Sequence, residues 1–289
     1  MRPARLVGEF HYRIPGRPVG VRPGAHASRA EGASGLYRGL RPLLAHADPR
    51  RLDLRRSATD PLGQWLARTM TERVAVPVYV VADLSASMAF GAGGGKRQTI
   101  AELAESAAQS AWRVGDPFGF VAADARVRES LTSLPMRSRA QGVRIAAALR
   151  ATALEGRSAD GLLDAARHLG RRRALVLLVS DFHFELAFTR RVLATLAGHF
   201  VVPVVVWDAA ETAGAAPQGW IEVADSESAD TRFLWLRPKL VDRIRAAAAE
   251  RRDSLTALFR SLGLRPLYLD GGFSAERMTR YFFGADDAA

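Results

Sequence analysis

Three uninterrupted apolar runs in the middle of this sequence limit what the chain can fold into. They lie at 76–83, 174–181 and 200–208 and are rich in valine or leucine. A run of this length without alternating polar residues predicts a β-strand that is buried on both faces. A segment with helical periodicity follows the first run at about 98–113. Alternation of buried strands with amphipathic helices predicts a doubly wound α/β fold with a largely parallel sheet.

The remaining segments extend this fold. The other expected helices lie at 61–72, 139–152, 160–169, 185–198, 239–262 and 273–283. The other expected strands lie at 118–124, 125–131 and 264–270, with a hairpin excursion near 217–237. We divide the chain into an N-terminal region, 1–72, and an α/β domain, 73–289. The N-terminal region is expected to begin as an irregular basic arm with a short strand at 6–14.

Positive charge is concentrated near the N-terminus. The chain carries a net charge of +11, and residues 1–59 contribute +8 of it, with twelve arginines against four acidic residues. A basic arm predicts an acidic partner, which is another protein, a membrane surface or a nucleic acid. The alternative is a compositional bias, because alanine and arginine are common throughout and lysine is scarce. The sequence leaves both interpretations open.

Composition excludes several kinds of site. The chain has no cysteine, so disulfides, thiolate metal ligands and cysteine nucleophiles are ruled out. Its six histidines show no short paired spacing of the kind that zinc sites use. No run of about 18 apolar residues occurs, and the N-terminus lacks the apolar stretch of a signal peptide. We therefore expect a cytoplasmic protein.

Oxygen-bearing side chains follow two of the apolar runs. Asp83 ends the first run, with Ser85 and Ser87 shortly after it, and Asp181 ends the second run. Ligands of open parallel sheets bind beyond the carboxyl ends of the strands, so these residues are expected to converge at one edge. Carboxylates and hydroxyls are hard oxygen donors that suit Mg²⁺ or Mn²⁺, whereas Ca²⁺ favours more carboxylates. The sequence predicts a divalent-metal site here.

The stretch Asp83-Leu84-Ser85-Ala86-Ser87 resembles the Asp-x-Ser-x-Ser motif of the metal-ion-dependent adhesion site (MIDAS) in von Willebrand factor A domains. In that family, a threonine from a second loop and an aspartate from a third loop complete the site. The resemblance places Asp181 at the third-loop position and Ser158 at the threonine position. It implies a von Willebrand factor A-like (Rossmann-like) fold with an irregular N-terminal extension. The implied metal ligands are Asp83, Ser85, Ser87, Ser158 and Asp181.

A second block, residues 47–54, resembles domain of unknown function 58 (DUF58), a group of bacterial von Willebrand A-like proteins often encoded beside MoxR-type AAA+ ATPases. The family pattern is roughly Gly-Asp-x-x-Arg-x-Ile-Asp-Trp, and Ala47 and Leu54 replace its glycine and tryptophan. Gly115-Asp116 and Asp225-Ser226-Glu227 are further matches, and the similarity covers roughly residues 35–283. On this resemblance, part of 1–72 is a family-specific segment. Many relatives carry two transmembrane helices before this region, and this sequence shows none.

The resemblance implies a non-enzymatic, metal-dependent adaptor. One coordination position of such a metal stays open, and a partner's carboxylate fills it. The implied partner is an AAA+ ATPase of the MoxR type, together with an unknown client complex that the pair assembles or activates. The main alternative is a protein that binds nucleic acid or another acidic surface through the basic N-terminal arm.

Structural roles are open for the same residues. Asp83, Ser85 and Ser87 are typical of an Asx turn or a helix cap. Ser158 is typical of a helix N-cap, and Asp160 beside it is able to assist or replace it. An ion-pair cluster is the favoured role for Asp48, Arg51 and Asp53.

The sequence disfavours two other functions, nucleotide binding through a P-loop and serine hydrolase activity. The glycine-rich run 91–97 has one residue too few for a phosphate-binding P-loop, and Arg97 stands where serine or threonine is needed. A serine hydrolase using Ser87, Asp181 and His183 lacks the Gly-x-Ser-x-Gly elbow.

Overall fold

The computed structural model describes most of the chain in two compact units. The described residues are 8–15, 23–32, 36–45, 48–91, 95–154, 156–208, 219–224, 231–236 and 238–284. The larger unit comprises Met1–Arg13, Pro77–Arg113 and Pro117–Ala289, and the smaller unit comprises Ile14–Val76 and Val114–Asp116.

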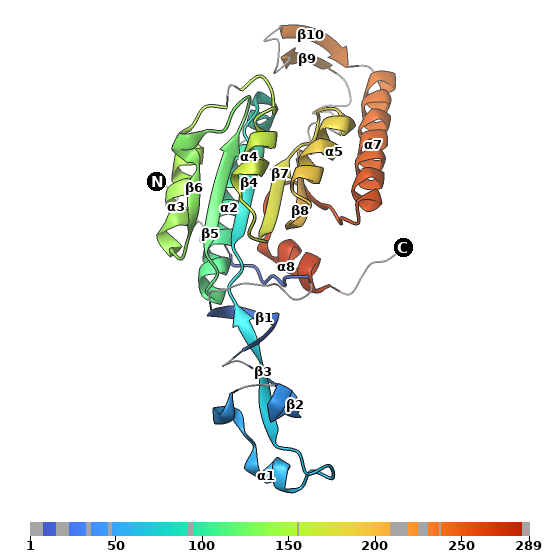
Figure 1. Ribbon diagram of the computed structural model, residues 1–289. Helices are drawn as coiled ribbons and strands as arrows, with labels where there is room; N and C mark the ends of the chain where they lie inside the picture. Colours follow the sequence, from blue (N-terminus) through green and yellow to red (C-terminus); the bar gives the residue numbers. More distant parts are fainter. Residues whose placement is uncertain are drawn as a thin grey trace. The chain divides into compact units, whose positions relative to one another are not determined.

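A six-stranded sheet forms the centre of the larger unit, in the order β11-β8-β7-β4-β5-β6 (Figure 1). Its strands are β4 (Val78–Asp83), β5 (Phe118–Ala123), β6 (Ser133–Met136), β7 (Leu175–Ser180), β8 (Phe200–Trp207) and β11 (Leu267–Asp270). All neighbours pair in parallel except β6, which is antiparallel to β5. Every residue of β4, β5 and β7 is buried. The expected α/β class with a mainly parallel sheet is therefore confirmed.

The chain reverses its direction of travel across this sheet at β4. From β4 it adds β5 and then β6 on one side, and it returns to add β7, β8 and β11 on the other. Val78 of β4 lies opposite Phe118 of β5 and Leu175 of β7, so the carboxyl ends of these strands are level. The switch point between β4 and β7 is where open α/β sheets bind ligands.

Helices pack against this sheet through their apolar stripes. They are α2 (Gly95–Val114), α3 (Arg139–Ala151), α4 (Leu162–His168), α5 (Leu186–Thr195), α7 (Pro238–Ser261) and α8 (Ala275–Phe283). Tyr79 and Val81 of β4 share a buried cluster with Leu162 of α4, Leu193 of α5 and Phe259 of α7. Helices α4 and α5 lie in front of the sheet in Figure 1. The helices expected at 98–113, 139–152, 160–169, 185–198, 239–262 and 273–283 are all present within a few residues.

The smaller unit is a three-stranded antiparallel sheet in the order β1-β3-β2. Its elements are β1 (Pro23–Gly32), β2 (Leu36–Pro42), two short 3-10 turns (Leu43–Ala45 and Pro49–Arg51), α1 (Leu54–Ala58) and β3 (Leu66–Val74). The expectation of an irregular N-terminal extension was wrong for these residues. Strands β1 and β2 contain few β-branched or large apolar residues, so hydrophobic periodicity gives them no signal.

Three local predictions also need correction. The helix expected at 61–72 was wrong, because this segment enters β3, which pairs with β1 and β2 on its two sides. Tertiary pairing here overrides an ambiguous local pattern. The strand expected at 125–131 was wrong, because its last residues form a 3-10 turn (Glu129–Leu131) and β6 follows it. Residues 8–14 form no strand.

The hairpin excursion is confirmed. β9 (Gly219–Ala224) pairs antiparallel with β10 (Thr231–Leu236), with Trp220 opposite Trp235. The matched residues Asp225-Ser226-Glu227 lie outside the described residues. Among the described residues, no helix combines the length and apolar character needed to cross a bilayer.

Candidate metal centre

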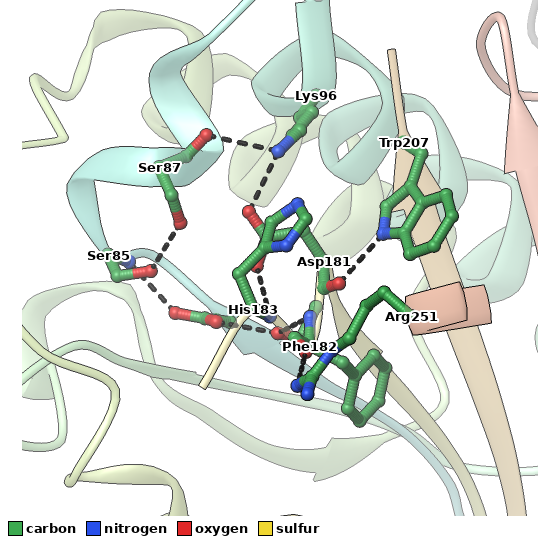
Figure 2. Close-up of polar contacts among 10 residues, drawn as sticks. Ser85, Ser87, Lys96, Asp181, Phe182, His183, Trp207 and Arg251 are labelled. Atoms are coloured by element: carbon green, nitrogen blue, oxygen red, sulfur yellow. Dashed lines mark hydrogen bonds and ion pairs between the residues drawn. The ribbon is translucent and has the colours of Figure 1, made fainter. Parts of the chain in front are cut away.

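Four of the five predicted ligands meet at the carboxyl ends of β4 and β7. Asp83 is the last residue of β4, and Asp181 directly follows β7. Ser85 precedes a short 3-10 turn (Ala86–Ala89) that contains Ser87, and the two serine hydroxyls lie 3.2 Å apart. Figure 2 shows both serines beside Asp181. Neighbouring parallel strands have brought together residues almost a hundred positions apart.

Asp83 is buried among neutral hydrogen-bond donors. Its Oδ1 accepts from the backbone N–H of Ser85 at 2.9 Å, and its Oδ2 accepts from the hydroxyl of Ser180 at 2.7 Å. Burial, reinforced by the nearby charge of Asp181, raises the pKa of Asp83 from 3.8 to about 6, although the hydrogen bonds from Ser180 and Ser85 oppose the rise. Near neutral pH this carboxylate is therefore held ionised at a cost in stability, which a cation bound beside it would relieve.

Asp181 has a different partner, which is the ammonium group of Lys96. The Lys96 Nζ lies 2.7 Å from Asp181 Oδ2, and both side chains are almost fully buried, at 1% and 2% exposure. Burial raises the pKa of Asp181, but the charges of Lys96 and His183 and the hydrogen bonds from Lys96 and Ser87 outweigh it, so the pKa falls below its usual value. The same ammonium donates to the carbonyl oxygen of Ser87 at 3.3 Å. Figure 2 shows Lys96 between Ser87 and Asp181.

Lys96 was missed as a site residue by the sequence reasoning, which considered it only as part of a P-loop. Its place in the fold is unusual, because it lies in the first turn of α2, where the helix dipole disfavours a cation. One signal was available in the sequence. The chain has 41 basic residues, and only Lys96 and Lys239 among them are lysines.

The loop after Asp181 is held in an unusual conformation. Phe182 has a φ of 53° and is 1% exposed, which places a bulky buried residue in the left-handed region. The indole N–H of Trp207 donates to the carbonyl oxygen of Asp181 at 2.8 Å, and the guanidinium of Arg251 donates to the carbonyl oxygens of Phe182 and Phe184. These bonds fix the backbone that carries the Asp181 side chain, and Figure 2 shows the ones from Trp207 to Asp181 and from Arg251 to Phe182.

The fifth predicted ligand, Ser158, lies on a loop beside the site. Gly156 of this loop pairs with Ser85 in a parallel bridge, and its carbonyl oxygen accepts from the N–H of Ala86 at 2.7 Å. A Cβ on Gly156 would stand 2.4 Å from the Cβ of Asp124, so only glycine allows this close approach. The Ser158 hydroxyl accepts weakly from the N–H of Asp160, at 3.5 Å. The Ser158 hydroxyl therefore stabilises the turn in which it lies, two residues after the bridge at Gly156.

The donor set fits a hard divalent cation. Two carboxylates and two hydroxyls converge, all through oxygen, and the Lys96 ammonium shows that these residues already enclose a positive charge. Within the described ranges, no group of three or more histidine, cysteine or acidic side chains is arranged to hold a metal. Any metal at this edge would therefore depend on Asp83 and Asp181 with hydroxyls and water.

An aspartate stands at the carboxyl end of every parallel strand. Besides Asp83 and Asp181, they are Asp124 after β5, Asp208 after β8 and Asp270 at the end of β11. Arg128 pairs with Asp124 at 2.5 Å, and Arg252 pairs with Asp270 at 3.1 Å. Asp208 lines a cavity of about 220 Å³ beside the candidate site. The cavity wall consists of Gly95, Lys96, Gln98, Thr99, Glu102, Val206, Trp207, Asp208, Gly271 and Gly272.

Asp48 and Asp53, in the N-terminal region, form ion pairs, which is the structural role that the sequence favours for them. The partner of Asp53 is Arg68, however, and not Arg51. Asp48 caps a 3-10 turn and pairs with Arg51 at 3.1 Å. Asp53 caps α1, and its partner is Arg68 at 2.8 Å.

Comparison with known proteins places the chain in one family. A family model described as "Protein of unknown function DUF58" matches residues 41–254. No curated protein matches the chain significantly.

Two solved structures show weak similarity. Proximal thread matrix protein 1 from the mussel byssus is 16% identical, with a TM-score of 0.33, over 46% of this chain and 38% of its own. The pilus adhesin SpaC from Lactobacillus rhamnosus GG is 12% identical, with a TM-score of 0.33, over 72% of this chain and 30% of its own. The chain thus spans less than half of the length of either structure.

Proposed function

The chain belongs to the DUF58 family, and from this premise we propose that it is a non-enzymatic protein-binding domain whose central site holds Mg²⁺ or Mn²⁺. One observation carries the proposal. Two buried carboxylates, Asp83 and Asp181, stand at adjacent strand ends with the hydroxyls of Ser85 and Ser87 beside them. An ionised carboxylate that is buried among neutral hydrogen-bond donors, as Asp83 is, is costly unless a cation is close.

Each residue has a distinct part in the proposed site. Asp83 and Asp181 supply the negative charge, and the hydroxyls of Ser85 and Ser87 supply neutral oxygen donors. Ser158 would reach the site only after its weak bond to the N–H of Asp160 is released. A bound divalent cation would offer one open position to a carboxylate of a partner protein. We assign no catalytic residue, because every group named here binds or positions.

A von Willebrand factor A-like fold is the finer proposal for the larger unit. Its support is the Asp83–Ser87 motif at the end of the central strand of a mainly parallel sheet, with Asp181 directly after the neighbouring strand. The cytoplasmic location expected from the sequence stays a prediction.

The proposed partner is an AAA+ ATPase of the MoxR type that acts with this chain on a client complex. Its support is the family resemblance, which associates DUF58 proteins with such ATPases. Exposed arginines in the N-terminal region, among them Arg50, Arg55 and Arg56, are suited to an acidic face of the ATPase. Binding to nucleic acid through these arginines is the rival.

Binding of a purified MoxR-type ATPase, measured in Mg²⁺ and in chelator, tests this proposal. We expect capture in Mg²⁺ only, and its loss in Asp83→Ala. Asp270→Ala is the matched control, since it removes a strand-end carboxylate that is paired with an exposed arginine. Replacing Arg50, Arg55 and Arg56 together by neutral residues tests the rival proposal, which is binding to nucleic acid. If that change abolished binding of duplex DNA and Asp83→Ala did not alter ATPase binding, the adaptor proposal would be wrong.

A further inference from the structure

We propose that Lys96 is a built-in competitor for the metal, whose ammonium occupies the cation position until a divalent ion displaces it into the adjoining cavity. This inference rests on the proposed function, because it concerns the regulation of the same site. It starts from the pair of Lys96 and Asp181, whose charged atoms lie 2.7 Å apart with both side chains almost fully buried.

The charge balance explains why the Lys96 ammonium and a divalent ion would not occupy the site together. Asp83 and Asp181 together carry two negative charges when ionised, and the Lys96 ammonium offsets one of them. A divalent ion placed between the carboxylates would neutralise both, and the ammonium beside it would then be repelled. Since the Lys96 Nζ donates to Asp181 Oδ2, one oxygen of this carboxylate is already engaged by a cation.

Arginine would not perform this role, which accounts for a lysine here in a chain where all but two of the basic residues are arginines. The ammonium is a compact charge on a flexible four-carbon stem, whereas a guanidinium is a rigid planar fork. The chain has only one other lysine, Lys239, which is exposed.

The structure also offers Lys96 a second position. The cavity of about 220 Å³ has Lys96 in its wall, together with the acidic residues Glu102 and Asp208. A rotation about the side-chain torsions of Lys96 would carry its ammonium from Asp181 towards these carboxylates, so the displaced charge would again have acidic neighbours. The glycines that line the cavity, among them Gly271 and Gly272, leave room for this movement.

The first test is metal affinity without the competing charge. Mn²⁺ is titrated calorimetrically into chelator-stripped wild type, Lys96→Met and the control Lys239→Met. We expect Lys96→Met to bind Mn²⁺ about tenfold more tightly or better, because a positive charge beside the ion is gone. Lys239→Met should match wild type. Equal affinity of wild type and Lys96→Met would overturn the role of Lys96 and leave the metal site intact, whereas absence of binding to both would overturn the metal site and with it the competition.

The second test uses only the wild-type chain, so it holds even if Lys96→Met fails to fold. A small amine-reactive reagent is applied with and without Mg²⁺, and mass spectrometry compares modification of Lys96 and Lys239. We expect Lys96 to be protected in chelator and Lys239 to react throughout. Modification of Lys96 should rise with Mg²⁺ along the same saturation curve as metal binding. Lys96 reacting as fast as Lys239 in chelator, or staying protected when metal saturates the site, would overturn the proposal.

Discussion

An aspartate stands at the end of the central strands of the sheet and also at the end of an outer strand, but its surroundings differ between the two places. At the outer strand β11, Asp270 is 38% exposed and pairs with Arg252, which is 42% exposed. At the central strand β7, Asp181 is 2% exposed and pairs with Lys96, which is 1% exposed. Asp83 of β4 is fully buried, and its hydrogen bonds come from Ser85 and Ser180. An aspartate at a strand end is thus not a site in itself.

Burial and the kind of charged partner therefore distinguish the aspartates of the candidate site from the aspartate at the end of β11. An exposed aspartate with an arginine is neutralised by a group that solvent also stabilises, and it has little need of another cation. When both are ionised, two buried carboxylates carry two negative charges, and the lysine paired with Asp181 offsets one of them. Four predictions follow from this contrast, from the largest expected effect to the smallest.

Removing the charge at the two strand ends should give very different losses of stability. Asp181→Asn leaves the Lys96 ammonium buried without its counter-charge, which typically costs about 3–5 kcal/mol of the free energy of unfolding. Asp270→Asn breaks an exposed pair and should cost less than about 1 kcal/mol. Urea unfolding in chelator measures both. The double variant Lys96→Met/Asp181→Asn should recover most of the first loss, and equal costs for the two single changes would contradict the comparison.

The raised pKa of Asp83 should appear as a pH-dependent penalty in the metal-free protein. Burial raises this pKa from 3.8 to about 6, so well below pH 3.8 the carboxyl is protonated in both states and stability is unaffected. Between pH 3.8 and about 6 the unfolded state has lost this proton while the folded state keeps it, so stability falls as pH rises and levels off once the folded state is ionised as well. At about 1.4 kcal/mol for each pH unit between the two pKa values, the penalty reaches about 3 kcal/mol.

Asp83→Asn tests this penalty, because it removes the charge while keeping an amide of similar shape. The stability of wild type relative to Asp83→Asn in chelator should therefore decline between pH 4 and 7. Denaturant unfolding of the two proteins at several pH values supplies the measurement. A constant difference between wild type and Asp83→Asn would show that Asp83 is not titrating near 6.

Ser158 should matter less to metal binding than the residues on β4 and β7. Its hydroxyl is engaged in its own turn, so Ser158→Ala should weaken Mn²⁺ binding by about tenfold, at the low end of the range for residues that act indirectly on a metal. Competition with a fluorescent metal indicator measures this change. Loss of binding as complete as in Asp83→Ala would instead make Ser158 a direct ligand.

The smallest expected effect comes from removing a hydrogen bond that holds the backbone of Asp181. Trp207→Phe removes the indole N–H that donates to the carbonyl oxygen of Asp181, while an aromatic ring remains to stack on His183. One hydrogen bond of this kind contributes about 1 kcal/mol to stability. Thermal unfolding of the two proteins in parallel gives the value. No change in stability would mean that the bond from Trp207 does not help to hold this loop.

Much of the larger unit was predictable from the sequence. The strands at 76–83, 174–181 and 200–208 are continuous apolar runs, and hydrophobic burial on both faces leaves little choice of structure. The convergence of Asp83 with Asp181 followed from strand ends alone. The smaller unit was not predictable, because β1 and β2 have few large apolar residues and their pairing with β3 is set by tertiary contacts.

The identity of the buried cation lay beyond the sequence for a different reason. Lys96 and Asp181 are 85 positions apart, and no local pattern shows that the ammonium turns inward rather than to solvent. A lysine in the first turn of a helix is ordinarily exposed. Only the packing of α2 against the end of β7 reveals that this lysine is buried.

A calorimetric titration of Mg²⁺ and Mn²⁺ into the chelator-stripped protein, beside Asp83→Ala and Asp270→Ala, tests the central claim most directly. We predict saturable binding of one ion in wild type and Asp270→Ala, and none in Asp83→Ala. Binding that survives in Asp83→Ala, or its absence from both wild type and Lys96→Met, would contradict a divalent-cation site at the ends of β4 and β7.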